Sequence, residues 1–254
     1  YGQISRDRLL IVDLTTIDEI EKSCPLDTHF FQNCTGHYKR IKLLASEDRS
    51  DMTPWLMQRS KFYGQSTNHP ELSRPFAPHL VAVRDAFLTS WGYIFDFKRW
   101  YIHGGCADRG FQLPTFEYDM DSQEVLRINE PVLNLVHPYP SMFYHEYVEL
   151  HSQLLMSLPI LSAYPNITIV VNKGLRLQNL FPLLELFNIN PRSYNFLGLK
   201  EAPQRNGRGP RRNAKFVYTT NAVIFSPFIV TPLSIYCQYV SRTTTNEMRK
   251  LYSR

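Results

Sequence analysis

Two residues four apart, His145 and Glu149, are the side chains of this sequence best suited to acid–base chemistry. On a helix, residues at this spacing lie one above the other. A carboxylate beside an imidazole fixes its tautomer and raises its basicity, so the pair is a candidate general base. The alternative is a solvent-facing pair that adds roughly a few tenths of a kcal/mol to helix stability.

A helix that carries this pair is expected over residues 141–158. Its apolar residues fall at spacings of four, three and four, one stripe at helical period. His145 and Glu149 point to nearly the opposite side. The residues of the stripe are Phe143, Tyr147, Leu150 and Leu154.

The elements around this helix alternate between apolar strands and helices. This order predicts an α/β fold with a parallel sheet, whose ligands bind at the carboxyl edge of the strands. The start of the helix at 141–158 would then face the ligand. The other expected elements are strands at 132–136 and 167–171, a helix at 177–187, a third strand at 215–220 and a short run at 222–225.

The part of the chain before residue 131 has a different pattern. Short β-type runs separated by glycine turns predict an antiparallel β-meander over 78–130, and residues 1–77 are polar and irregular. On the meander, Arg84 and Asp85 are adjacent. Neighbours on a strand point to opposite faces, so one of them should point inward. They either support the sheet as an ion pair or reach a cleft.

Three segments resemble glycosyltransferase family 61. The run from Tyr144 to Glu149, followed by Leu154-Leu155, is similar to the family's pattern of an aromatic residue, His, three residues and an acid before a leucine-rich stretch. Residues 81–96 resemble its β-meander, and residues 165–171 resemble its next strand. The resemblance covers residues 78–250.

The resemblance implies a fold and an activity. Residues 131–254 would form one Rossmann-like half of a GT-B glycosyltransferase, the acceptor-side half, with the β-meander N-terminal to it. Such enzymes are inverting and metal-independent, and transfer a sugar from a UDP-sugar to a hydroxyl of a glycan or a protein. No cofactor is expected. The segments typical of the donor half do not occur in these 254 residues, so we expect the chain alone not to transfer sugar.

Site residues follow from the same resemblance. His145 and Glu149 are assigned as the catalytic pair, with no decision on which member takes the proton. Acceptor binding is assigned to Tyr139, Tyr144, Arg84 and Asp85. The alternative function is a non-catalytic secreted domain of the same fold that binds carbohydrate or mediates adhesion.

Cysteines and sequons favour a secretory compartment. Cys24 and Cys34 flank a short polar loop, which a disulfide would close, and Asn33 and Asn166 each begin an N-x-Thr glycosylation sequon. The expected location is the lumen of the Golgi or of the endoplasmic reticulum. Residues 216–241 carry no charge but are too polar for a membrane span, so any anchor would lie outside this chain.

Other chemistries find little support. The formal net charge is 28 − 23 = +5, and the arginines at 205–212 form a loop without interleaved aromatic rings, so nucleic-acid binding is not expected. Asp119 and Asp121 spell an Asp-x-Asp that could hold a divalent cation. They stand in an acidic, turn-like run that reads as a solvated loop, and no metal site is predicted.

Overall fold

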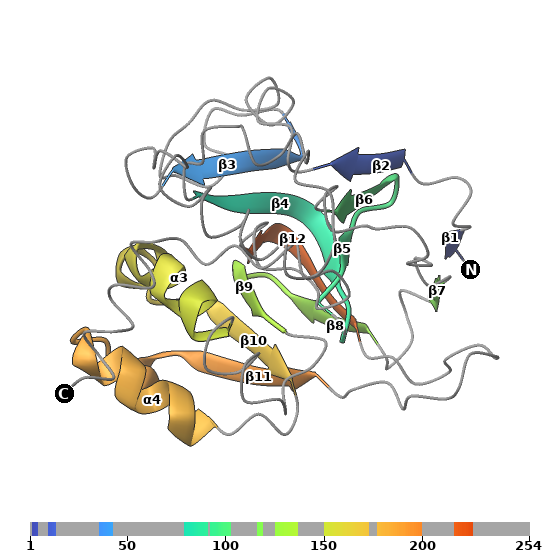
Figure 1. Cartoon of the computed structure of the whole chain (residues 1–254). Helices are drawn as coiled ribbons and strands as arrows, with labels where there is room; N and C mark the ends of the chain where they lie inside the picture. Colours follow the sequence, from blue (N-terminus) through green and yellow to red (C-terminus); the bar gives the residue numbers. More distant parts are fainter. Residues whose placement is uncertain are drawn as a thin grey trace, which may run out of the picture.

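The structure, a computed structural model, describes residues 2–4, 10–13, 36–42, 79–90, 92–102, 116–118, 125–136, 150–172, 177–199 and 216–225 (Figure 1). The strands are β1 (Gly2–Ile4), β2 (Leu10–Asp13), β3 (Tyr38–Lys42), β4 (His79–Leu88), β5 (Ile94–Phe95), β6 (Arg99–Ile102), β7 (Phe116–Tyr118), β8 (Val125–Ile128), β9 (Val132–Leu135), β10 (Thr168–Asn172), β11 (Asn195–Leu199) and β12 (Phe216–Phe225). The helices are α3 (His151–Ala163), α4 (Leu177–Leu186) and the 3₁₀ turn η5 (Pro191–Ser193).

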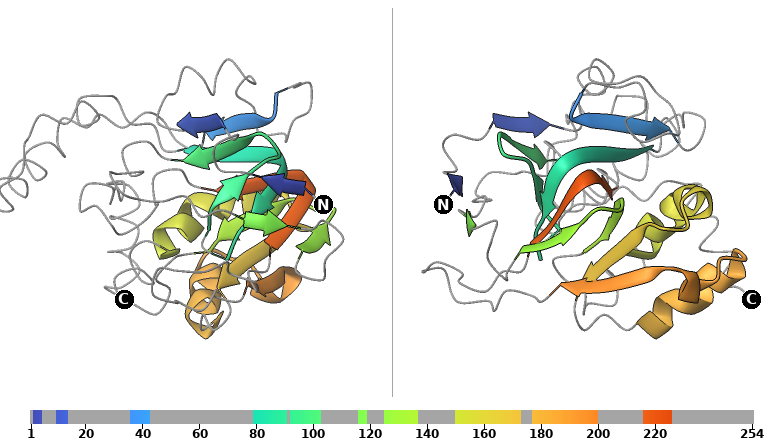
Figure 2. Two further views of the ribbon diagram at one scale, coloured as in Figure 1. Left: turned by 90° about the vertical axis from the view of Figure 1, so that its right-hand side faces the viewer. Right: turned by 180° about the vertical axis from the view of Figure 1, so that it is seen from behind.

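One mixed sheet organises the described residues. Its order is β11-β10-β9-β12-β4-β5-β6-β2, with β3 also paired to β4 and β8 also paired to β12. Strands β11, β10, β9 and β12 run parallel to one another, and β4 runs antiparallel to β12. Figure 2 shows β4 and β12 crossing the middle of this sheet. Strands β1 and β7 form a separate antiparallel pair. The fold is therefore α/β, as predicted.

Helices α3 and α4 cover one face of the parallel strands. Alternate strand residues, Leu133 and Leu135 on β9 and Ile169 and Val171 on β10, pack in one apolar cluster with leucines of both helices. The period of two along each strand places these side chains on one face. Burial of such side chains is the main force that holds the helices on the sheet.

The opposite face is covered where the end of β4 curls over it. Leu88 and Ile94, on either side of the β4–β5 turn, share an apolar cluster with residues of β9 and β12 on this face. In that turn the carbonyl of Gly92 accepts a hydrogen bond of 3.2 Å from Nδ2 of Asn134 on β9. Gly92 has φ +80°, and a Cβ there would stand 2.7 Å from the carbonyl oxygen of Val136. Only glycine allows this approach.

Several elements agree with the sequence prediction. Strands β9 and β10 match the predicted strands at 132–136 and 167–171, and α4 matches the predicted helix at 177–187. Strands β4, β5 and β6 form an antiparallel meander within residues 79–102. The rest of the predicted meander differs, because β7 pairs with β1 and β8 runs parallel to β12. Single-face patterning and continuous apolar runs therefore suffice to predict these elements.

One parallel strand, β11 at Asn195–Leu199, was not predicted. The predicted strand at 215–220 is present: it joins the run at 222–225 in one strand, β12, which runs parallel to β8 and β9. Strand β11 lies at the edge of the sheet and exposes Asn195 and Gly198, so it has no continuous apolar run. Helix α3 continues to Ala163, beyond the predicted end at 158, because Ile160 and Leu161 pack into the core after Pro159.

Candidate functional site

The carboxyl edge of the parallel strands is the first candidate region. Strand order reverses between β9 and β12: β10 and β11 follow on one side of β9, and β12 lies on the other. In open α/β sheets, ligands bind at the carboxyl ends of the strands where such a reversal occurs. The switch between β9 and β12 is therefore the place where this topology favours a ligand.

The predicted catalytic residues belong to the connection that leaves this edge. Residues 137–149, which include His145, Glu149, Tyr139 and Tyr144, lie outside the described residues. Strand β9 ends at Leu135 and α3 begins at His151, directly before and after that stretch. The assignment of the catalytic pair and of the two tyrosines stays a prediction.

A hydrogen-bonded turn fixes the end of β9. Oδ1 of Asn134 accepts from the backbone N–H of Val136 at 2.9 Å, while its amide nitrogen donates to Gly92. Asn134 is buried, with 8 % of its surface exposed. Its amide therefore sets the direction in which the chain leaves β9. Sequence reasoning read this residue only as part of an apolar strand.

Arg84 holds the chain ahead of β3. Its Nε and Nη2 donate to the carbonyl oxygen of Gly36 at 2.9 and 2.7 Å, and its backbone N–H donates to the carbonyl of His37 at 2.9 Å. Two donors of one guanidinium on one carbonyl oxygen tie β3 to β4. These contacts favour the supporting role for Arg84 over a direct contact with acceptor.

Asp85 stands at an irregularity of the sheet. Thr219 pairs with Ala86 and Ala222 with Arg84, so two residues of β12 lie opposite the single residue Asp85. Asp85 has φ 49°, a left-handed conformation that non-glycine residues rarely adopt and that aspartate tolerates better than most. Bulges of this kind re-aim a side chain and often occur beside functional sites.

The side chain of Asp85 contacts Tyr218 on β12. Burial raises the pKa of the Tyr218 hydroxyl, and the charge of Asp85 and its hydrogen bond with the hydroxyl raise it further, while Arg127 lowers it. Arg127 on β8 pairs in register with Tyr218. Asp85, Tyr218 and Arg127 thus form a polar group on three neighbouring strands.

An aromatic cluster adjoins this polar group. The rings of Phe87 and Phe95 stack with centroids 4.8 Å apart, and Tyr218 lies 4.8 Å from Phe87. Phe97 makes edge contacts with Phe87 and Tyr218 at 5.3 and 5.9 Å, and 45 % of its surface is exposed. Phe97 thus lies next to Tyr218, whose hydroxyl is hydrogen-bonded to Asp85. An exposed ring can stack on a sugar, and the nearby polar groups can bind the hydroxyl groups of the sugar.

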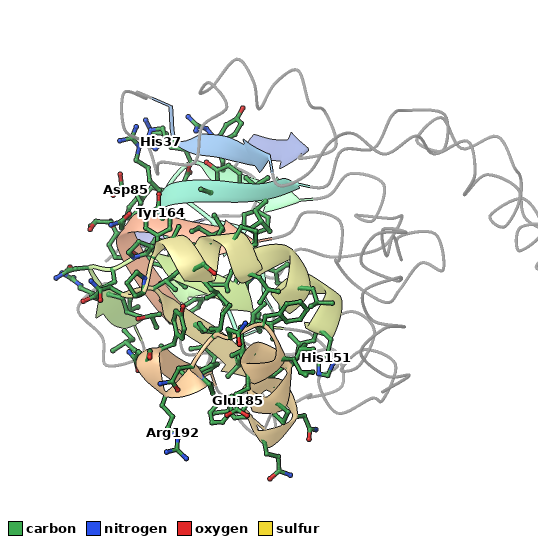
Figure 3. All side chains as sticks on the ribbon, turned by 90° about the vertical axis from the view of Figure 1, so that its left-hand side faces the viewer. His37, Asp85, His151, Tyr164, Glu185 and Arg192 are labelled. Atoms are coloured by element: carbon green, nitrogen blue, oxygen red, sulfur yellow. The ribbon has the colours of Figure 1, made fainter. Side chains whose placement is uncertain are left out.

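The polar group of Asp85, Tyr218 and Arg127 and the switch point between β9 and β12 lie at opposite ends of the parallel strands. Ala222 pairs with Arg84, and the next residue, Val223, pairs with Val132, so Asp85 is level with the start of β9. Figure 3 shows Asp85 and Tyr164, which follows α3, on one side of the molecule and His151 at the other end of α3. The connection with His145 leaves β9 at its opposite end.

A buried carboxylate in the β5–β6 turn is a polar site that the sequence did not reveal. Asp96 accepts from the backbone N–H groups of Lys98 and Arg99 at 2.6 and 2.7 Å and from the hydroxyl of Tyr101 at 2.6 Å. Burial raises the pKa of Tyr101, and its hydrogen bond to Asp96 raises it further. Three donors satisfy this carboxylate, so it stabilises the turn. An Asp three residues before Arg in a turn was the available sequence signal.

An open hollow lies at the amino ends of the parallel strands. Its volume is about 610 Å³, and residues 126–130, residues 165–168, Ser193, Asn195 and Leu197 line it. We call it the amino-edge hollow. Asn166, the predicted glycosylation site, is exposed on its wall, whereas Asn33, Cys24 and Cys34 lie outside the described residues.

Within the described stretches, no three His, Cys, Asp or Glu side chains gather as a metal site would require. Asp119 and Asp121 lie outside those stretches. In the described part of the chain, no helix has the length and apolar character needed to cross a membrane. Comparison of the chain with protein-family models, with curated proteins and with solved structures found no match.

Proposed function

We propose that the chain is the acceptor-side part of an inverting glycosyltransferase of the Golgi or endoplasmic-reticulum lumen. It would help to transfer a sugar from a UDP-sugar to a hydroxyl of a glycan or a protein. The observation that carries the proposal is the strand order β11-β10-β9-β12, which is the order of a Rossmann-like half with its switch point beside β9. His145 and Glu149 belong to the connection that follows β9.

In the proposed reaction, the His145/Glu149 pair removes the proton from the acceptor hydroxyl. The acceptor oxygen then forms a bond to the anomeric carbon of the donor sugar. The bond from that carbon to the diphosphate oxygen breaks, and UDP leaves with the electron pair. Attack from the face opposite UDP inverts the configuration. The step needs a positioned base and no oxidant, and we expect no metal cofactor.

The proposed acceptor contacts indicate an extended acceptor. Tyr139 and Tyr144 belong to the connection that leaves the carboxyl end of β9, whereas Asp85 is level with the start of that strand. A strand of four residues spans roughly 13 Å. An acceptor that reaches both ends is therefore an oligosaccharide or a peptide segment, and a single sugar is too short.

Replacement of the proposed base tests this function. His145→Ala, made in the natural protein produced from its complete reading frame, should lower UDP release with a panel of UDP-sugars and acceptors by about 10²–10⁴-fold. The matched control is Glu185→Gln, which neutralises an exposed carboxylate on α4 away from the switch point. Normal turnover by His145→Ala would contradict the base assignment. Unfolding of the variant would show that His145 is structural.

A carbohydrate-binding domain without catalysis is the second candidate. The observation that favours it is the exposed Phe97 ring beside Tyr218, whose hydroxyl is hydrogen-bonded to Asp85; this group needs no nucleotide to bind a glycan. Phe97→Ala would then abolish retention of the protein on a glycan array recorded without UDP-sugar. Glycan binding without any UDP-sugar turnover by the natural protein would favour this candidate over the transferase.

A further inference from the structure

The amino-edge hollow has the size of a binding site and lies apart from the switch point, and it shares Arg127 with the polar group of Asp85 and Tyr218. Its volume of about 610 Å³ falls in the range of about 300–1,000 Å³ that is usual for ligand pockets. Residues before β9 and before β10 form part of its wall, and Asn195 begins β11. It therefore lies at the end of the parallel strands that is opposite to the switch point.

The lining of the hollow is polar and balanced in charge. Three side-chain amides, those of Asn129, Asn166 and Asn195, contribute to it. Its charged side chains are one cation, Arg127, and one anion, Glu130. Opposite charges in equal number offer no net attraction to a phosphate or to an ammonium group. This lining suits a neutral ligand that both donates and accepts hydrogen bonds.

Apolar residues complete the chemistry of the hollow. Leu126, whose surface is 46 % exposed, and the half-buried Ile128 and Leu197 offer an apolar surface between the polar groups. Asn195 donates from Nδ2 to Oγ1 of Thr168 at 3.5 Å, which orients one amide at the wall. A sugar ring has the matching surface, with C–H groups on its faces and hydroxyl groups around its edge.

We propose that the amino-edge hollow binds a neutral saccharide of one or two units that carries N-acetyl groups. Amide side chains pair with an acetamido group as well as with hydroxyl groups. Asn166 begins an N-x-Thr sequon on the wall of the hollow, and every N-glycan begins with two N-acetylglucosamine units. The saccharide can therefore come from the chain's own glycan or from a separate molecule. This site stands whether or not the transfer reaction at the opposite edge is correct.

The experiment uses N,N′-diacetylchitobiose as the probe. The 254-residue chain with Asn166→Gln, produced by secretion, keeps an amide at the wall but cannot carry a glycan there. Isothermal calorimetry should show saturable binding of the disaccharide. Ser193→Trp in the same background should fill the hollow and weaken binding by ~10-fold or more. Ser162→Trp, at an exposed position of α3 outside the hollow, is the matched control and should bind normally.

Leu126→Asp is the second variant, because it removes apolar surface and adds a charge without opening the core. It should weaken binding in the same direction, and the melting temperature of each variant checks the fold. No saturable binding by the Asn166→Gln chain, or equal binding by folded Ser193→Trp, would overturn the site. Binding of the disaccharide by the secreted chain that retains Asn166 then distinguishes the two sources of the saccharide. Binding blocked by its glycan indicates that the glycan occupies the hollow, and unchanged binding indicates a separate saccharide.

Discussion

The two sides of the central sheet bury their surfaces in different ways. The parallel strands β9, β10 and β11 pack aliphatic side chains against two helices. The antiparallel strands β4, β5 and β6 share a second, mostly aliphatic cluster with β9 and β12 on the other face. The rings of Phe87, Phe95 and Tyr218 are not part of that cluster and pack on one another. Parallel strands need crossover connections, which α3 and α4 provide between β9, β10 and β11, whereas the antiparallel strands use a bulge at Asp85 and a glycine turn at Gly92.

This difference has a consequence for function. The helix-covered side has a switch point that the fold itself creates, and the chemistry proposed there depends on a connection after β9. The curled side consists of β4, β5 and β6 with the adjoining parts of β12 and β8. Its polar groups lie on strands, and strand register holds Asp85, Tyr218 and Arg127 in place. Strands position side chains more firmly than connections do. We therefore expect binding specificity on the curled side and the reacting groups at the switch point.

The largest expected effect is the loss of the ring of Phe87 from the curled side. Phe87 is fully buried and contacts Phe95, Phe97 and Tyr218. Phe87→Ala should lower the free energy of unfolding by about 3–5 kcal/mol, through lost contacts and a cavity. Urea denaturation, monitored by near-UV circular dichroism, measures this loss of stability.

The matched variant on the helix-covered side is Leu184→Ala, at a fully buried residue of α4. It should lower the free energy of unfolding by about 2–5 kcal/mol. The near-UV spectrum of the folded protein should stay unchanged, because no ring of the aromatic cluster is lost. A cost below about 1 kcal/mol for Phe87→Ala would mean that the aromatic cluster contributes little to the fold.

The next effect concerns the hydroxyl of Tyr101, which donates to the buried Asp96. Tyr101→Phe should lower the free energy of unfolding at neutral pH by about 1.5–3 kcal/mol, since a bond to a charged group is lost. The pKa of Tyr101 is raised in the folded state, so the unfolded tyrosine ionises first as pH rises. Above about pH 10 the unfolded state then binds fewer protons, and stability falls with pH.

The measurement is thermal unfolding at intervals between pH 8 and pH 11. The native protein should lose stability above about pH 10, and Tyr101→Phe should lose less over the same interval. Equal slopes for the two proteins would show that Tyr101 ionises as readily in the folded state, and that the hydrogen bond to Asp96 does not hold its proton.

Gly92 joins the two sides, and its replacement should have an intermediate effect. Gly92→Ala has to adopt φ +80° and to place a Cβ 2.7 Å from the carbonyl oxygen of Val136. We expect a loss of about 1–3 kcal/mol in urea denaturation. Gly198→Ala, at an exposed position of the edge strand β11, is the control and should change stability little. Equal stability of both variants would mean that the turn can move away from β9.

The sequence predicted those elements on both sides whose signals are local. Continuous apolar runs indicate β9 and β10, and leucines at helical spacing indicate α4. The bulge at Asp85 depends on a register between residues more than 130 positions apart, and no local pattern shows it. Strand β11 was missed because an edge strand needs little apolar character. The amino-edge hollow arises from segments distant in sequence, so only the structure could show it.

The smallest expected effect compares two non-glycine residues with positive φ, the two found in the described residues, one on each side. Asn188, with φ 59°, ends α4, where the N–H of Ile189 donates to the carbonyl of Leu184 at 3.0 Å. This position at a helix end favours glycine, so Asn188→Gly should raise the free energy of unfolding by about 0.4–1 kcal/mol or leave it unchanged.

Asp85→Gly also relieves a positive φ but loses the carboxylate that contacts Tyr218, so the pKa of Tyr218 should fall. Spectrophotometric titration of the tyrosines and thermal melts of both variants measure these changes. If Asp85→Gly leaves the tyrosine titration unchanged and gains stability as Asn188→Gly does, Asp85 merely completes the bulge, and the binding role proposed for the curled side loses its carboxylate.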